Sequence, residues 1–306
     1  AVGGRVPGGQ VPADRGGGEA LPVDGHTGVV QEDRVGPVRR EPVHAFGQAQ
    51  GAGDAARRVV VAGRPEDRDA GLPEDLVQVV VGGEETGEAL VRAGVDKIVF
   101  TGSAGTGRAV LAAAADSLTP VVLELGGKDP AIVLEDADLR RAARGVVWGA
   151  FLNAGQSCIA VERAYVVDEV YDAFLREVLN LAGKVRAGSG PGSDMGPMAT
   201  ARQLAWVEEQ LREAVEAGAK VAVGGVRTDP ASNVLHPTVL TDVDPDSGVL
   251  IKETFGPVLP VMAFDEVGEA IALANDTPYG LGGSAYTSAP VVAERCWREL
   301  RTGMLH

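Results

Sequence analysis

The sequence predicts an α/β protein built on parallel sheets from about residue 72 onward. Short apolar runs of strand length, such as 97–100 and 131–134, alternate with longer stretches whose apolar residues recur at helical spacing, such as 171–185. Strands that alternate with helices of this length favour parallel sheets covered by helices on their faces. The chain of 306 residues is long enough for two domains and a large core.

Each expected element has a local reason in the sequence. A valine-rich run predicts a strand at 77–81, and the helix at 84–93 begins with glutamates, which the positive end of a helix dipole favours. Either Asp136 or Asp138 caps the helix that ends near Asn153. The further expected strands are 120–124, 163–167, 220–223 and 279–286; the further expected helices are 108–115, 201–217, 266–275 and 291–301, and 303–306 begins another strand.

Residues 1–68 differ from the rest of the chain. They contain no lysine or isoleucine, one leucine (Leu21) and one aromatic residue (Phe46), while glycine, arginine, proline and valine dominate. A segment of this composition buries too little apolar surface to offset the entropy of ordering it. We expect either a disordered extension or out-of-frame translation of a GC-rich gene, because ordinary patterning starts abruptly near 69–73. Resequencing the upstream DNA distinguishes the two.

Composition and charge exclude several classes of protein. The net charge is −15, and because residues 1–68 carry nine arginines and nine acidic residues, all of it lies in 69–306. This charge argues against nucleic-acid or membrane partners bound through bulk electrostatics. We find no apolar run near the ~18 residues of a membrane span, and no signal peptide. Two cysteines give no disulfide framework, which fits a reducing compartment such as the cytoplasm.

The two cysteines have different surroundings. Cys158 follows a Gly-Gln-Ser turn at 155–157, which suits an exposed functional side chain, although this stretch alone leaves a structural role open. Cys296 falls on the apolar side of a helical pattern, where a small core residue is the simpler interpretation. A thiol reacts as the thiolate, and the pKa of a free cysteine is about 8.5, so Cys158 also needs a partner group.

Histidine is not the expected partner of Cys158. His26 and His44 lie in 1–68, His306 is the last residue, and His236 lies in a turn, so a Cys–His pair is not expected. The cysteines and histidines also lack the spacing of metal ligands, so no metal site is expected.

Two acidic residues beside turns are better candidates for chemistry. Glu124 ends an apolar strand and precedes two glycines, so we expect its carboxylate to be partly removed from water, which suits a general base. A strand-end glutamate that faces solvent is the alternative. Glu253 and Phe255 bracket a turn into a strand, for which a capped turn with a core phenylalanine is the alternative.

A glycine-containing turn offers a phosphate site. The strand at 97–100 runs into Gly102, Ser103 and Gly107 before the helix at 108–115, and such a turn points backbone N–H groups and a positive helix end at a phosphate. The turn is not G-x-G-x-x-G, so close packing of helix on strand is the alternative. A cysteine nucleophile, a carboxylate base and a phosphate-binding turn together suit a thiol-dependent dehydrogenase that uses a dinucleotide.

Four motifs, in this order and at this spacing, give residues 69–306 a specific resemblance to the aldehyde dehydrogenase superfamily. The resemblance implies an aldehyde dehydrogenase-like α/β fold, with a partial Rossmann-type NAD(P)-binding domain at 69–124 and an α/β catalytic domain at 125–306. It also implies assembly as a homodimer or homotetramer. The motifs are Phe100-Thr101-Gly102-Ser103 with Gly107, Glu124-Leu125-Gly126-Gly127-Lys128, Gly155-Gln156-Ser157-Cys158 and Glu253-Thr254-Phe255-Gly256-Pro257.

The resemblance implies a role for each motif. Cys158 is expected to add to a small-molecule aldehyde, whose hydride then leaves to NAD or NADP, with NAD favoured. Glu124 is expected to activate the water that hydrolyses the resulting thioester. The expected cofactor-binding residues are Gly102, Ser103 and Gly107 near the pyrophosphate, Leu125 lining the site, Glu253 at the nicotinamide ribose and Phe255 beside the nicotinamide ring.

The chain departs from the family pattern in three places. Residues 1–68 contain no tryptophan or asparagine, so the family's Pro-Trp-Asn oxyanion donor is not found, and losing one such donor typically costs about 10²–10³ in rate. The lysine motif that binds the adenosine ribose is also missing, and the sequence stops before the family's oligomerisation strand. The alternative function is therefore a truncated, catalytically impaired remnant that acts at most as a thiol esterase or a subunit-binding fragment.

Overall fold

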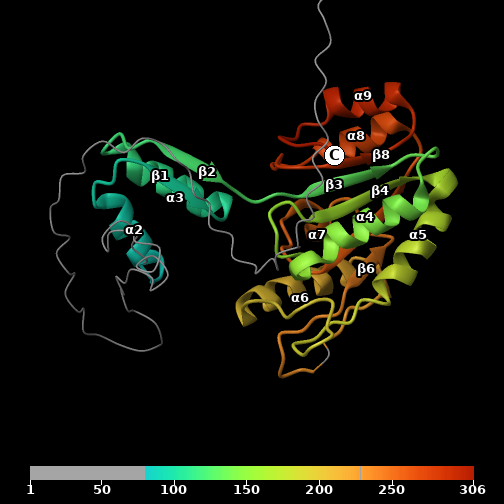
Figure 1. The fold of residues 1–306 in the computed structure, drawn as a ribbon, viewed down its shortest axis with the longest axis horizontal. Coiled ribbons are helices and arrows are strands. Elements are labelled where there is room, and N and C mark those ends of the chain that lie inside the picture. The colour runs from blue at the N-terminus through green and yellow to red at the C-terminus, as the bar shows by residue number, and fades with distance from the viewer. Residues whose placement is uncertain (1–79, 228) are drawn as a thin grey trace, which may run out of the picture. The chain divides into compact units, whose positions relative to one another are not determined.

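The structure, a computed structural model, has the expected α/β fold and describes residues 80–227 and 229–306 (Figure 1). Strands in these residues form two separate sheets, one of two strands and one of six. The segment 1–68 lies outside the described residues. So does most of the expected strand at 77–81, whose last two residues, Val80 and Val81, are not in a strand.

The two-stranded sheet belongs to the segment 80–124. Its strands are parallel, with Ile98 opposite Val121 and Thr101 opposite Glu124. This places the start of the glycine turn beside the end of the strand that carries Glu124. The elements of this segment are α2 (Glu84–Arg92), β1 (Ile98–Thr101), α3 (Ala104–Ala115) and β2 (Val121–Glu124).

Helix α3 begins earlier than the sequence predicts. Ser103 caps it, because its hydroxyl oxygen accepts a hydrogen bond from the Thr106 N–H at 3.2 Å. The start expected at residue 108 is therefore wrong, and Gly105 and Gly107 lie in the first turn of the helix rather than in a loop.

The six-stranded sheet has the order β5-β6-β7-β4-β3-β8. All neighbouring strands are parallel except β5 and β6, as the alternation of strands and helices predicts. The strands are β3 (Asp129–Val133), β4 (Val161–Val167), β5 (Lys220–Val223), β6 (Thr238–Thr241), β7 (Val258–Phe264) and β8 (Ser284–Tyr286).

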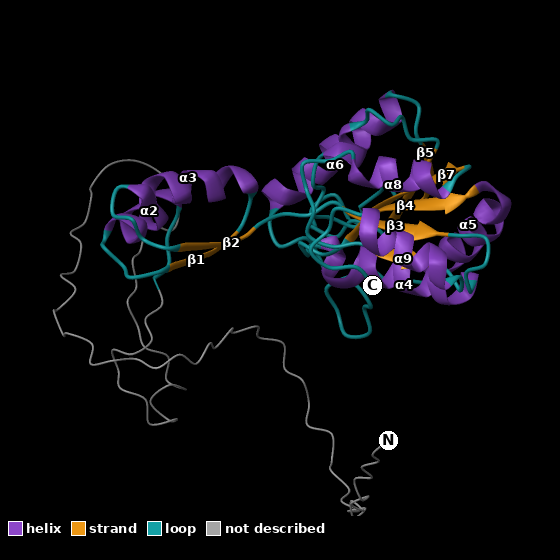
Figure 2. Ribbon diagram, turned by 90° about the horizontal axis from the view of Figure 1, so that it is seen from above, coloured by secondary structure: helices purple, strands orange, loops and turns teal. Residues whose placement is uncertain are grey.

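Helices cover both faces of this sheet (Figures 1 and 2). Because side chains alternate along a strand, Ala131 and Val133 join a core with α4, α5 and α6, while Ile132 joins a second core with α8 and α9. Cys296 is fully buried in the second core, which confirms its interpretation as a core residue. The helices are α4 (Leu139–Phe151), α5 (Asp168–Ala182), α6 (Ala201–Glu216), α7 (Gly248–Ile251), α8 (Val267–Asn275) and α9 (Pro290–Glu299).

Local hydrogen bonds decide the boundaries that the sequence left open. Asp138 caps α4, since its carboxylate accepts from the N–H groups of Arg140 and Arg141 at 3.1 Å each. Asp136 instead holds the hydroxyl of Thr287 at 2.7 Å. The strand expected at 279–286 is shorter, Ser284–Tyr286, and the backbone of His306 forms hydrogen bonds with Gly283 and Ala285.

None of the helices within 80–227 and 229–306 combines the length and the apolar composition that a membrane span needs.

Candidate active site

Cys158 lies in a loop whose backbone is shaped by three consecutive residues in the left-handed conformation. After α4 ends, Asn153, Ala154 and Gly155 have φ angles of 54°, 57° and 69°. Non-glycine residues adopt this region rarely, at a cost of about 1–2 kcal/mol each. Two hydrogen bonds hold this backbone conformation. The Asn153 side-chain amide donates to the backbone carbonyl of Gln156 at 3.0 Å, and the Gln156 side-chain amide donates to the backbone carbonyl of Asn153 at 2.9 Å. The half-buried thiol therefore projects from a fixed loop.

Burial and nearby carboxylates hold the Cys158 thiol in its protonated form. Burial raises the pKa of Cys158 most, and the charges of Asp129, Glu253 and Glu124 raise it further. Asp129 is itself buried, which raises its pKa to about 7, although the Gly282 N–H donates to its carboxylate at 3.1 Å. Thiol activation at neutral pH therefore needs a group that removes the proton.

The structure corrects the expected environment of Glu124. Side chains alternate along β2, and Glu124 falls on the same exposed face as Val122. The expected partial removal of its carboxylate from water is therefore wrong. The carboxylate is nevertheless among the charges that raise the pKa of the Cys158 thiol, although its contribution is smaller than those of burial, Asp129 and Glu253.

The glycine turn and Glu124 are also close in the structure. The Gly102 N–H donates to the Glu124 carbonyl at 3.0 Å. A Cβ on Gly107 would lie 2.6 Å from a methyl carbon of Leu125, so a larger residue there would have to displace the end of that side chain. This close approach agrees with the packing alternative for Gly107, and its phosphate-binding role stays a prediction. The first turn of α3 contains no acidic side chain, so its positive end stays compatible with a phosphate.

The carboxylate of Glu253 is oriented by the segment that follows Leu125. Its Oε1 accepts a hydrogen bond from the Gly127 N–H at 3.1 Å. A Cβ on Gly126 would lie 2.3 Å from Oε2, so this glycine allows the carboxylate its close approach to the backbone. Burial raises the pKa of Glu253, and the Gly127 N–H opposes that effect. Phe255 is half-buried, so the alternative of a core phenylalanine is wrong.

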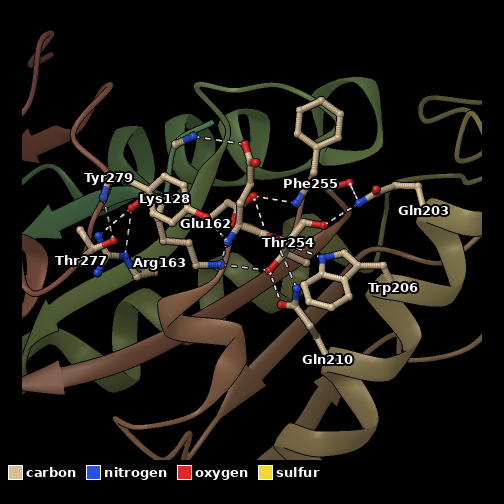
Figure 3. Close-up of polar contacts among 12 residues, drawn as sticks. Lys128, Glu162, Arg163, Gln203, Trp206, Gln210, Thr254, Phe255, Thr277 and Tyr279 are labelled. Atoms are coloured by element: carbon tan, nitrogen blue, oxygen red, sulfur yellow. Dashed lines mark hydrogen bonds and ion pairs between the residues drawn. The ribbon is translucent and has the colours of Figure 1, made fainter. Parts of the chain in front are cut away.

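Three side chains of α6 bind the carbonyl oxygens of the segment 253–255 (Figure 3). Trp206 and Gln210 both donate to the first carbonyl, at 3.1 and 3.2 Å. Gln203 donates to the second and third, at 2.9 and 3.2 Å. Residues three and four apart share a face of a helix, so α6 presents all three donors to the turn.

The N–H groups of the same segment meet a buried ion pair. Glu162 accepts from the backbone of Thr254 and Phe255, and its carboxylate lies 2.5 Å from the Lys128 ammonium. Burial lowers the pKa of Lys128, and the charge of Glu162 opposes this. The Tyr279 hydroxyl accepts from the Glu253 N–H at 3.4 Å. Every backbone polar group from 253 to 255 thus has a side-chain partner.

Sequence patterns did not single out these supporting residues. Glu162 is 34 positions from Lys128 and 92 from Thr254, so no local spacing connects them. The one available signal was the row Gln203, Trp206 and Gln210, whose helical spacing places polar side chains beside an apolar face. Among the described residues, no group of three or more histidine, cysteine or acidic side chains could hold a metal ion.

An α/β fold in which a cysteine loop packs against an anchored acidic turn defines the class of this chain. Residues 67–306 match the model of the aldehyde dehydrogenase family, and the chain belongs to that family.

Relatives and solved structures agree with this assignment. The chain is 45% identical over 232 residues to 4,4'-diapolycopene aldehyde oxidase of Methylomonas sp, covering 76% of this chain and 43% of the relative. It resembles the crystal structure of lactaldehyde dehydrogenase from Escherichia coli with a TM-score of 0.75 and 40% identity, over 78% of this chain and 51% of that one.

A third comparison is with betaine aldehyde dehydrogenase from Staphylococcus aureus in complex with NAD+. The TM-score is 0.74 at 32% identity, over 78% of this chain and 49% of that one. The chain spans about half the length of the curated relatives it matches.

Proposed function

We propose that this chain oxidises a small-molecule aldehyde to a carboxylic acid with transfer of hydride to NAD or NADP, and that Cys158 is the nucleophile. The observation that carries the proposal is the contact between the Cys158 loop and the Glu253 turn. A Cβ on Gly155 would lie 2.1 Å from the Gly256 carbonyl oxygen. This contact supports the proposal, because the loop that carries the expected nucleophile packs directly against the turn that carries the expected cofactor-binding carboxylate.

The first half of the reaction belongs to the thiol. Cys158 gives up its proton and its sulfur forms a bond to the aldehyde carbon, while the carbonyl π electrons move to the oxygen, which takes up a proton to give a thiohemiacetal. Loss of hydride from the same carbon, which bound NAD(P) would accept, together with loss of the hydroxyl proton to water leaves a thioester on Cys158. Because burial and three carboxylates raise the pKa of the thiol, proton removal contributes to the barrier at neutral pH.

The second half of the reaction belongs to Glu124. Its exposed carboxylate takes a proton from water, the resulting hydroxide equivalent attacks the thioester carbon, and the carbon–sulfur bond breaks to release the acid and the Cys158 thiolate. An exposed base is consistent with this role, since the water it activates must reach it from solvent.

The residues present fit a dinucleotide. Gly102, Ser103 and Gly107 surround the start of α3, whose positive end carries no competing carboxylate, and Leu125 packs against it. Glu253 offers a half-buried acceptor for ribose hydroxyls. Bound NAD(P) would supply the hydride acceptor. We favour NAD, and equal or better turnover with NADP would contradict that preference.

Reduced dinucleotide formation tests the proposal. Purified protein is given short aldehydes with NAD or NADP, and absorbance at 340 nm is followed; the aldehydes include lactaldehyde and betaine aldehyde, which the names of two similar proteins give. We expect activity that Cys158→Ala abolishes and Cys296→Ala retains. Glu124→Gln should slow turnover by about 10²–10⁴ while a burst of one equivalent remains. No aldehyde-dependent signal from the folded chain would overturn the proposal.

A thiol esterase is a second candidate, because Cys158 and the exposed Glu124 suffice for ester hydrolysis without a dinucleotide. Hydrolysis of p-nitrophenyl acetate, lost in Cys158→Ala, would support it if no dehydrogenase activity is found. We also propose a homodimer or homotetramer in the cytoplasm. Light scattering of the purified protein and fractionation of source cells test these two points.

A further inference from the structure

The roles proposed above leave a buried ion pair unexplained. Lys128 and Glu162 are 1% and 2% exposed, and their charged atoms lie 2.5 Å apart. Removal of two charges from water is costly, and the attraction between them repays it only when further hydrogen bonds complete the geometry. Such a pair is a weak stabilising device by itself, so its other contacts indicate its role.

Both oxygens of Glu162 bind the backbone of the turn that follows Glu253 (Figure 3). The Thr254 N–H donates to them at 2.8 and 3.1 Å, and the Phe255 N–H donates at 2.8 Å. Hydrogen bonds to an ionised acceptor are shorter and roughly twice as strong as neutral ones. One side chain thus fixes two consecutive peptide groups beside the Glu253 carboxylate.

Phe255 needs this support because its backbone is strained. Its φ of 49° lies in the left-handed region, which a bulky residue rarely adopts. Strained backbone persists only where the surroundings over-determine it. Here Glu162 binds the N–H of Phe255 and Gln203 binds its carbonyl oxygen at 3.2 Å.

Lys128 binds the same turn from the segment that carries the glycine motif. Its ammonium donates to the Thr254 hydroxyl at 3.0 Å, and the preceding Gly127 N–H donates to the Glu253 carboxylate at 3.1 Å. The ion pair therefore connects three segments, β4, the 126–128 segment and the turn, at the point where Glu253 is oriented.

We propose that Glu162 is a positioning residue for the dinucleotide: through the N–H groups of Thr254 and Phe255 it sets the orientation of the Glu253 carboxylate and the Phe255 ring. The proposal rests on the proposed function, in which these two side chains contact the dinucleotide. The hydrogen bonds of Glu162 go to Lys128, Thr254 and Phe255. Loss of Glu162 should therefore change the affinity for the dinucleotide and the rigidity of the turn, and should leave the reactivity of Cys158 as it is.

Glu162→Gln tests this, since it keeps the shape and removes the charge. Hydrogen exchange of the Thr254 and Phe255 amides is measured, together with NAD and NADP affinity from quenching of Trp206, whose indole donates to the Glu253 carbonyl. The exposed Trp148 and Trp297 are replaced by phenylalanine so that Trp206 alone reports. We expect the exchange rate of both amides to rise at least about tenfold, and the dinucleotide Kd to rise by at least the same factor. Cys158 alkylation should change by less than about twofold.

Tyr171→Phe is the matched control, because it removes a hydrogen bond to the Val261 carbonyl in the same sheet without touching the turn. It should leave amide exchange and Kd unchanged. If Glu162→Gln does not fold, the double variant Lys128→Met with Glu162→Gln leaves no unpaired buried charge and takes its place.

The outcomes separate the two proposals. Equal dinucleotide affinity in the parent and the Glu162 variant overturns the positioning role alone. Failure of the parent to bind either dinucleotide overturns the proposed function. In that case the amide exchange rates still test the link between Glu162 and the turn, and equal rates in the parent and the Glu162 variant overturn it. If neither variant folds, Glu162 is purely structural and the positioning role is rejected.

Discussion

The backbone of Gly155 lies directly against the carbonyl oxygen of Gly256. A Cβ on Gly155 would lie 2.1 Å from that oxygen, and Gly155 has a φ of 69°. Gly256 is equally confined, since its own Cβ would lie 2.4 Å from a methyl carbon of Val207 on α6. The Cys158 loop, the Glu253 turn and helix α6 therefore form one packed stack.

Gly155→Ala should be strongly destabilising. The new methyl group clashes with backbone atoms, which cannot rotate away as a side chain can, and the left-handed conformation adds strain. We expect a loss of about 2–4 kcal/mol in the free energy of unfolding, measured by urea denaturation. Gly190→Ala is the control, because a Cβ at that exposed position meets no atom within 4 Å. Equal stability of the two variants would contradict the stacking argument.

Asp129 should make the stability of the protein depend on pH. Its pKa is raised to about 7 from an ordinary 3.8, so the folded state binds this proton more tightly than the unfolded state. The resulting stabilisation is complete below about pH 4 and is lost as the pH rises through 7. Asp129→Asn keeps an acceptor for the Gly282 N–H, and we expect it to stabilise the protein by about 1–3 kcal/mol at pH 8.

Urea denaturation of parent and Asp129→Asn at pH 5 and pH 8 measures this effect. The difference in stability should be clearly larger at pH 8 than at pH 5, because the stabilisation by the protonated carboxyl is lost between about pH 4 and 7. Asp246→Asn changes an exposed aspartate and should leave the pH dependence as it is. A constant difference between the two pH values would show that Asp129 is ionised throughout.

The reactivity of the Cys158 thiol should also depend on the Asp129 carboxylate. Burial and the charges of Asp129, Glu253 and Glu124 raise the pKa of Cys158, so its rate of alkylation by iodoacetamide should rise with pH to a midpoint above the ~8.5 of a free cysteine. Asp129→Asn should move that midpoint to lower pH. Mass spectrometry of the labelled peptides should find Cys296 unmodified until the protein unfolds, because it is fully buried. A midpoint at or below pH 8 in the parent would contradict this account.

Much of the fold could be predicted because periodicity and caps act locally. The helices at 171–185 and 201–217 and the strand at 163–167 are confirmed with shifts of a few residues at their ends. The start of α3 was missed because Gly105 and Gly107 carry no side chains from which a helical period could be read. The exposure of Glu124 was missed because β2 is apolar on both faces, so its pattern does not show which face meets water.

Less of the site could be predicted, because its supports are long-range. Cys158 was found from its turn, which is a local signal. Glu162 was not, since it lies just before the strand expected at 163–167, and its role is visible only once the structure shows Lys128 and the turn at 253–255 around it. Contacts between positions this far apart in the sequence arise from the packing of β4, the glycine motif and α6.

The hydrogen bonds from α6 should be required for the rigidity of the Glu253 turn. Gln203 donates to the carbonyl oxygens of Thr254 and Phe255, and Gln203→Met keeps its size while leaving both oxygens without that donor. We expect a loss of about 1–3 kcal/mol in the free energy of unfolding. We also expect a rise in dinucleotide Kd, read from the fluorescence of Trp206. Arg202→Met, an exposed position on the same helix, should change neither quantity by more than about 0.5 kcal/mol. A Gln203→Met protein with the parent's stability and affinity would show that Trp206, Gln210 and Glu162 hold the turn without it.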